Sequence, residues 1–180
     1  MGDGTIPIVV AGGMMTTGYF KNSSRLYNTG IEMASALLTG AIVDQIIKRS
    51  TGRETPNKAT EPRGRWAPFP SFKQYSSNTS KYDAVPRGHI LSATALFPVF
   101  QERYPEYNYI TYPVEVLWLG VLGFGMLNVG VHWASDYPLG IAVGYVFGRA
   151  AVRLHKPDAH GKVSSWRFFP GLHVETDAPT

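Results

Sequence analysis

A histidine and an aspartate four residues apart, His132 and Asp136, are the first side chains in the sequence suited to chemistry. Side chains at this spacing on a helical turn share a face, so the carboxylate can accept a hydrogen bond from one imidazole nitrogen. That contact would fix the tautomer and leave the other nitrogen unprotonated, as a nucleophilic histidine requires. The alternative for this pair is a histidine at a membrane boundary with a capping aspartate.

A second candidate site is the tetrapeptide Pro86-Arg87-Gly88-His89, where a basic loop turns into an apolar segment. Proline and glycine let the backbone approach a ligand, and the first amides of a helix attract an anion. We therefore expect Gly88 to contact an anion, and His89 on the first turn to protonate a leaving oxygen. The alternative is a solvated histidine in a turn that leads into a helix.

Two basic residues complete the set of candidates. Lys48 directly follows an apolar stretch, and Arg53 comes five residues later. Both can hold an anion, although a solvated basic helix end is the simpler alternative. Each candidate site lies where an apolar segment meets a loop. If the apolar segments cross a bilayer in alternating directions, the sites emerge on the same side.

Five apolar stretches are expected to form the helices that position these side chains. They are Thr5–Phe20, Gly30–Ile47, His89–Phe100, Pro113–Val131 and Pro138–Val152. The twenty residues between Glu115 and Asp136 contain no Asp, Glu, Lys or Arg, which is about the length needed to cross the roughly 30 Å of hydrocarbon in a bilayer. This segment is the best candidate for a membrane span. The other four also fit buried helices of a soluble bundle.

Length and composition indicate one domain. Residues 1–154 are expected to form a helical domain with a loop or lid at 50–86, followed by a tail at 155–180. Charged residues make up 17% of the 180 residues, below the roughly 25% of soluble domains. The absence of cysteine excludes disulfide bonds and thiolate metal sites.

Positive charge is concentrated in the expected loop. The whole chain carries 17 Lys and Arg against 13 Asp and Glu, a net charge of +4, and the segment 48–87 alone carries nine Lys and Arg against three Asp and Glu. Such a segment suits a phosphorylated small molecule or an anionic lipid. No nucleic-acid recognition motif accompanies it, so a nucleic-acid partner is not expected. Four aromatic residues within it predict a packed lid: Trp66, Phe69, Phe72 and Tyr75.

The order of the candidate sites resembles the type 2 phosphatidic acid phosphatase superfamily, which also includes bacterial acid phosphatases and vanadium haloperoxidases. The family's first motif is a lysine with Arg-Pro seven residues later, and Lys48 with Thr55-Pro56 stands in its place. The second, Pro-Ser-Gly-His, corresponds to Pro86–His89. The third, Ser-Arg, then five residues, His, three residues and Asp, corresponds to Gly125–Asp136.

This resemblance extends over roughly Gly2–Val152 and implies an all-α, membrane-embedded helical bundle. It implies His132 as a nucleophile that forms a phosphohistidine, Asp136 as the group that orients it, His89 as general acid and Lys48 as a phosphate ligand. No cofactor and no metal ion is expected, because lysine, arginine and helix amides would carry the charge. The family usually has one more helix ahead of the segment that matches Thr5–Phe20.

Three positions depart from the family motifs. Thr55 and Met126 stand where the family has arginines, and Arg87 stands where it has serine. Loss of two guanidinium groups would cost several kcal/mol of transition-state binding, because phosphoryl transfer depends mainly on positioning and charge. Arg53 and Arg87 are the side chains expected to bind phosphate in their stead.

These features predict a membrane phosphatase that hydrolyses a lipid phosphate or pyrophosphate monoester. One alternative is a catalytically impaired relative that binds phosphate or lipid, or serves as a structural subunit, within a larger membrane complex. Another is a soluble acid phosphatase or haloperoxidase, which would require residues 113–131 to be buried in protein.

The resemblance also implies a location in a membrane, with the bacterial inner membrane as the expected one. We expect the active site to face the extracytoplasmic side, because basic residues lie at the other ends of the segments. These are Lys21, Arg25, Arg103, Arg149, Arg153 and Lys156. The loop at 50–86 is richer still in Lys and Arg, which opposes this orientation.

Overall fold

The computed structural model describes residues 5–86, 88–128, 130 and 132–155. Over these residues the regular structure is helical, with two isolated β-bridges and no strand. The long helices are α1 (Thr5–Phe20), α2 (Ser24–Thr51), α4 (Gly88–Arg103), α5 (Asn108–Asn128) and α6 (Tyr137–His155). The short elements are α3 (Phe72–Ser77) and four 3₁₀ turns, η1 (Pro56–Lys58), η2 (Thr79–Lys81), η3 (Pro105–Tyr107) and η4 (Ala134–Asp136). The expected all-α fold is confirmed.

Helix α2 is longer than its apolar stretch predicts, because it has a cap at each end. It begins at Ser24, where the side chain of Ser23 accepts a hydrogen bond from the amide of Leu26 at 3.5 Å. At its other end Gly52 adopts a left-handed conformation, φ 54°, and its amide donates to the carbonyl of Lys48. Glycine adopts this conformation without steric cost, so the helix stops one turn after Lys48.

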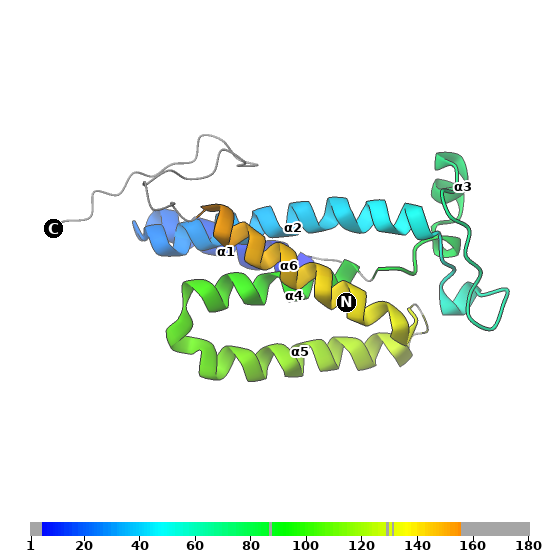
Figure 1. The fold of residues 1–180 in the computed structure, drawn as a ribbon. Helices are drawn as coiled ribbons and strands as arrows, with labels where there is room; N and C mark the ends of the chain where they lie inside the picture. The colour runs from blue at the N-terminus through cyan, green and yellow to red at the C-terminus, as the bar shows by residue number, and fades with distance from the viewer. Residues whose placement is uncertain (1–4, 87, 129, 131, 156–180) are drawn as a thin grey trace.

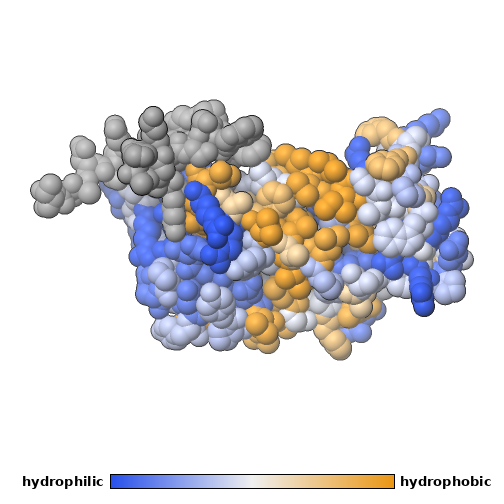
Figure 2. Space-filling model, viewed as in Figure 1, coloured by the Kyte–Doolittle hydropathy of each residue, from blue (hydrophilic) through white to orange (hydrophobic). Residues whose placement is uncertain are grey.

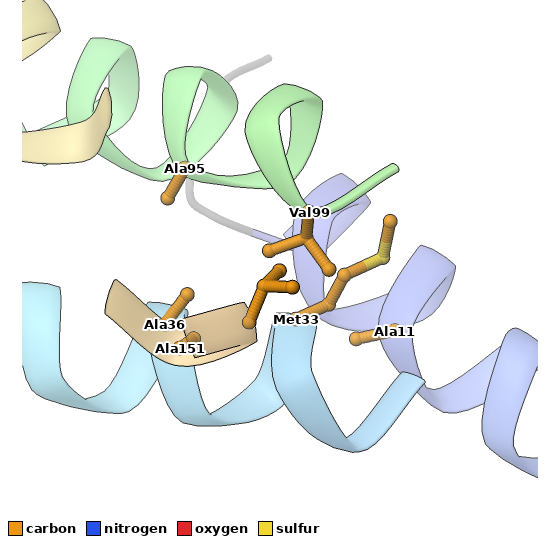
Figure 3. Packing of buried hydrophobic residues seen from close by; sticks show 7 residues of the cluster. Ala11, Met33, Ala36, Ala95, Val99 and Ala151 are labelled. Atoms are coloured by element: carbon orange, nitrogen blue, oxygen red, sulfur yellow. The ribbon is translucent and has the colours of Figure 1, made fainter. Parts of the chain in front are cut away.

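The core lies between α1, α2, α4 and α6 (Figure 3). Its fully buried members are small or flexible: Ala11, Met33, Ala36, Ala95, Val99, Ala151 and Val152. Helix α6 packs closely on α4 through Gly144 and Gly148, since a Cβ on Gly144 would lie 2.4 Å from the carbonyl oxygen of Leu91. Small residues spaced by four let two helix backbones approach in this way. Helix α5 runs beside α4 at the edge of the bundle (Figure 1).

Large apolar side chains cover much of the outer surface, as Figure 2 shows for one face. On α5, Val116, Leu117 and Phe124 are 74, 68 and 70% exposed. Among the described residues, α2 is the one helix that is long and apolar enough to cross a membrane. The described part of the expected span 113–131 belongs to α5 up to Asn128.

The expected loop at 50–86 is a folded lobe at the end of α2 (Figure 1). Arg53 forms isolated bridges with Trp66 and with Asp83, and the Glu54 carboxylate accepts three hydrogen bonds from Thr60 and Arg65 within the lobe. Burial alone would raise the pKa of Glu54, but the hydrogen bonds from Thr60 and Arg65 together outweigh it, so the pKa of this carboxyl is lowered. Because residues that break helices are frequent in this segment, long-range backbone pairing organises the lobe instead of a long helix.

The aromatic side chains of the lobe do not all pack as expected. Tyr75 is buried, whereas Trp66, Phe69 and Phe72 are 51, 78 and 72% exposed. The prediction of a packed aromatic lid is therefore wrong for three of its four members, because the lobe is held together mainly by backbone and polar contacts. Apart from His155, the expected tail 155–180 lies outside the described residues.

Candidate functional site

The end of α2, the start of α4 and the segment before α6 meet at one end of the bundle. Lys48 lies in the last turn of α2, and a Cβ on Gly88, the first residue of α4, would lie 3.1 Å from Oδ2 of Asp44. The hydroxyl of Thr51 donates to the carbonyl of Val85 at 3.3 Å. The end of α2, which carries the first motif, thus packs against the start of α4 and the residue before the second motif.

His89 and His132 are neighbours in space, although they are 43 positions apart in the sequence. The centroids of their rings are 6.5 Å apart, and the ring planes meet at 79°. His89 lies on the first turn of α4, and His132 lies between α5 and the 3₁₀ turn η4. Both rings are half-buried. The structure therefore brings together the two histidines, whose catalytic roles remain predictions.

A backbone carbonyl holds the ring of His132. Its Nδ1 lies 3.0 Å from the carbonyl oxygen of Ala84. Because a carbonyl can only accept a hydrogen bond, we assign the proton to Nδ1, which leaves Nε2 with its lone pair. Sequence reasoning expected Asp136 to perform this task. Nothing in the sequence indicated Ala84, because every residue has a backbone carbonyl and the residue type does not show which one accepts a hydrogen bond.

Asp136 forms an ion pair with Arg53. Its Oδ1 accepts from Nη1 of Arg53 at 2.5 Å, and its Oδ2 accepts from the amide of Trp133 at 3.0 Å. Asp136 is 1% exposed. Burial raises the pKa of this carboxyl, and the Trp133 amide and the guanidinium act in the opposite direction. A carboxylate buried this deeply needs such a partner to stay ionised.

Arg53 crosses from the lobe to the third motif. Its guanidinium lies 4.9 Å from the ring centroids of both Trp66 and Trp133, donates to Ser135 at 2.9 Å and reaches the carbonyl of Arg63 at 3.0 Å. Its Nε is buried without a hydrogen-bond partner among the described residues. The sequence identified Arg53 as a candidate, and the structure places it beside Asp136.

Lys48 lies between two carboxylates that sequence reasoning missed. Its Nζ is 3.1 Å from Asp44 and 3.2 Å from Asp83, and Asp83 also accepts from the hydroxyl of Tyr75 at 2.6 Å. Burial, followed by that hydrogen bond, raises the pKa of the Tyr75 hydroxyl. The spacing of four between Asp44 and Lys48 was the available signal, because residues four apart share a helix face.

The three positions that depart from the family motifs have different outcomes. The hydroxyl of Thr55 is within hydrogen-bond distance of Asn57 Oδ1 at 2.7 Å and of the carbonyl of Ser80 at 3.0 Å, so this residue holds the lobe together. Arg87 and the side chain of Met126 lie outside the described residues. The expectation that Arg87 binds phosphate therefore stays a prediction.

An apolar cavity of about 430 Å³ begins at His89. It extends between α1, α4 and α5 and is lined by Val10, Phe97 and Trp118 among others. The same imidazole thus borders both the polar histidine pair and a space suited to hydrocarbon. Among the described residues, no group of three or more His, Asp or Glu is arranged to hold a metal ion.

Comparison with known proteins gives one match. The sequence model of the PAP2 superfamily matches residues 29–159. No curated protein and no solved structure matches the chain. The matched range contains all the candidate residues from Lys48 to Asp136 and begins within α2.

Proposed function

The chain belongs to the PAP2 superfamily, and on that basis we propose that it is a membrane phosphatase that hydrolyses a lipid phosphate or pyrophosphate monoester through a phosphohistidine at His132. The observation that carries the proposal is the 6.5 Å separation of the His89 and His132 rings. Reacting atoms in a productive complex lie about 3–3.5 Å apart. Two imidazoles this close together can both contact one bound phosphate group, so that one can act as nucleophile and the other as proton donor.

Two steps complete the reaction. First, Nε2 of His132 attacks phosphorus, the bond between phosphorus and the ester oxygen breaks, and His89 donates a proton to the leaving alcohol. Then water attacks phosphorus, His89 takes a proton from it, and the bond between phosphorus and Nε2 breaks to release phosphate. Throughout, the carbonyl of Ala84 stabilises the positive charge that forms on the imidazole, because it accepts from Nδ1.

Charge on the phosphate oxygens would be balanced by Lys48, Arg53 and the first amides of α4. Asp44 and Asp83 hold Lys48 in place, and Asp136 holds Arg53. Fixed charges of this kind need little reorganisation during the reaction, which is why they contribute strongly to catalysis. The start of α4 at Gly88 offers amide hydrogens in the same region.

Two observations support a place in the membrane. Helix α2 has 28 residues, which corresponds to about 42 Å of helix and exceeds the roughly 30 Å of a bilayer core. Helix α5 turns Val116, Leu117 and Phe124 outward, where lipid would solvate them better than water. The site would then lie at one membrane boundary. The basic residues Arg25, Arg103 and Arg149 favour the cytoplasm for the opposite boundary.

Phosphate release from lipid phosphates in detergent micelles tests this proposal. We expect His132→Ala to lower turnover at least a thousandfold, since removal of a nucleophile leaves only binding and charge stabilisation. His155→Ala is the matched control, because His155 lies at the far end of α6 with its Nδ1 2.6 Å from the carbonyl of Ala151. Full turnover in His132→Ala would contradict the proposed nucleophile.

A second candidate function has its own support. In a catalytically impaired relative, the chain would bind a phosphate or lipid as a subunit of a membrane complex. The two carboxylates around Lys48 already balance its charge, and Thr55 uses its hydroxyl within the lobe. Binding of orthovanadate without turnover, together with co-purification of another membrane protein in fixed stoichiometry, would favour this function. Robust phosphatase turnover by the isolated chain would exclude this second function.

A further inference from the structure

The cavity that begins at His89 has a defined direction. On α4 its lining recurs on one face, at His89, Ala93, Phe97 and Phe100. His89 and Phe100 are eleven residues apart, which corresponds to about 16 Å along a helix. The cavity therefore follows α4 away from the histidine pair.

Helix α5 gives the same length independently. Its lining residues extend from Leu122 to Thr111, again eleven residues and about 16 Å. Because α4 and α5 are antiparallel and joined by a short turn (Figure 1), Leu122 lies at the level of His89 and Thr111 at the level of Phe100. Two facing helices thus border an elongated apolar channel with His89 at one end, and the channel is partly open at its side, where Val114 and Trp118 are 47 and 39% exposed.

A polar contact joins α4 and α5 beside the channel. Directly after Phe100, Nε2 of Gln101 donates to Oε2 of Glu115 at 2.7 Å and ties α4 to α5. Helix α1 borders the channel with Pro7 and Val10. The lining residues of α4 extend over about 16 Å, from His89 to Phe100.

We propose that this channel holds the hydrocarbon tail of the substrate, and that the substrate is a phosphate monoester of a single long chain. This inference rests on the proposed function, because it places the phosphate between His89 and His132. The volume of about 430 Å³ lies in the lower part of the range of about 300–1,000 Å³ that proteins use for one small ligand. One chain fills it, whereas two acyl chains would compete for it.

Blocking substitutions test the channel at two depths. Ala93 lies four residues from His89, about 6 Å along α4, and Val114 lies eight residues from Leu122, about 12 Å along α5. We expect Ala93→Phe to lower the ratio of kcat/KM for a sixteen-carbon over a four-carbon alkyl phosphate by about tenfold or more, since each excluded methylene is worth about a factor of four. Val114→Phe should affect only the longer tails. Because the ratio is compared between variant and parent in the same micelles, the different partition of the two substrates into detergent cancels.

The matched control lies on the same helix outside the channel. Val116 is 74% exposed and points away from the lining, so Val116→Phe should leave the ratio unchanged. Val114 is 47% exposed, so its substitution can be accommodated even if Ala93→Phe fails to fold. An unchanged ratio in folded Val114→Phe for tails long enough to reach it would overturn the channel. Equal kcat/KM for phosphatidic acid and a single-chain phosphate would overturn the preference for one tail.

A binding readout separates this inference from the proposed activity. Trp118 lines the channel four residues from Leu122, about 6 Å from the His89 end. A non-hydrolysable alkyl phosphonate that carries bromine on its middle carbons should quench Trp118 fluorescence. Excess unbrominated phosphonate should reverse the quenching, and Trp118→Phe should remove it. Quenching without hydrolysis would refute the phosphatase and retain the tail channel, whereas hydrolysis without reversible quenching would refute the channel alone.

Discussion

The ion pair between Arg53 and Asp136 offers a stringent test of how the site is built. The sequence assigned Asp136 to His132, whereas in the structure its carboxylate pairs with Arg53 at 2.5 Å. Arg53→Met removes the guanidinium and keeps most of the apolar stem. Asp136→Asn removes the charge and keeps an oxygen for the amide of Trp133. The two substitutions and their combination form a double-mutant cycle.

The expected magnitude follows from burial. The side chains of Arg53 and Asp136 are 9% and 1% exposed. Removing one partner of a buried pair leaves an uncompensated charge and costs about 3–5 kcal/mol. We therefore expect each single variant to lose about 3 kcal/mol, and the double variant to lose about 2 kcal/mol less than the sum of the two.

Thermal unfolding in detergent measures these losses, and phosphate release measures function beside them. Glu106→Gln is the control, because the Arg25 pair with Glu106 is 49% and 46% exposed and should contribute much less to stability than the buried pair. If Asp136 acts through Arg53, both single variants and the double variant will show the same loss of kcat/KM. A coupling energy near zero, together with multiplicative losses of activity, would refute this reasoning and return Asp136 to a role on His132.

Two further predictions concern packing and pH. Gly144→Val should separate α6 from α4, since a Cβ there would meet the carbonyl of Leu91 at 2.4 Å; we expect a loss of about 3 kcal/mol or more in thermal unfolding. Gly12→Ala, in the interior of α1 with open space around it, should cause no loss, because alanine favours a helix over glycine. Hydrogen bonds from Thr60 help lower the pKa of Glu54 in the folded lobe, so the stability that they provide is present above the ordinary carboxyl pKa and is lost as pH falls through the lowered value. Limited proteolysis of the lobe should therefore accelerate with acid in the parent protein, and Glu54→Gln should flatten that dependence; an identical pH profile in the two proteins would contradict the assignment.

Much of the bundle is visible in the sequence because apolar runs report helices directly. The runs at 5–20, 30–47, 89–100 and 138–152 all lie within helices of the structure. The start of α2 was missed because its first turns are polar, and a cap together with the Arg25 ion pair stabilises them. Such stabilisation comes from contacts that hydrophobic periodicity does not report.

The candidate site likewise has one part that the sequence predicts and one part that it does not. The meeting of His89 and His132 was predictable, because helices that alternate in direction return to the same side of a bundle. The partners of those side chains were not. Ala84 contributes a backbone carbonyl, and Asp83 reaches Lys48 from a lobe whose fold depends on long-range backbone pairing. The spacing of the motif residues predicts which side chains lie close together. It does not predict which atoms form hydrogen bonds or ion pairs with them.

The measurement that tests the central claim most directly is the trapping of a covalent intermediate. Protein mixed with a radiolabelled lipid phosphate and quenched in alkali should carry label on a peptide that contains His132, and that label should be released by acid, as expected for a bond between phosphorus and nitrogen. His132→Ala should carry none. Turnover by the parent protein with no trapped label on this peptide, or equal labelling of His132→Ala, would contradict the account.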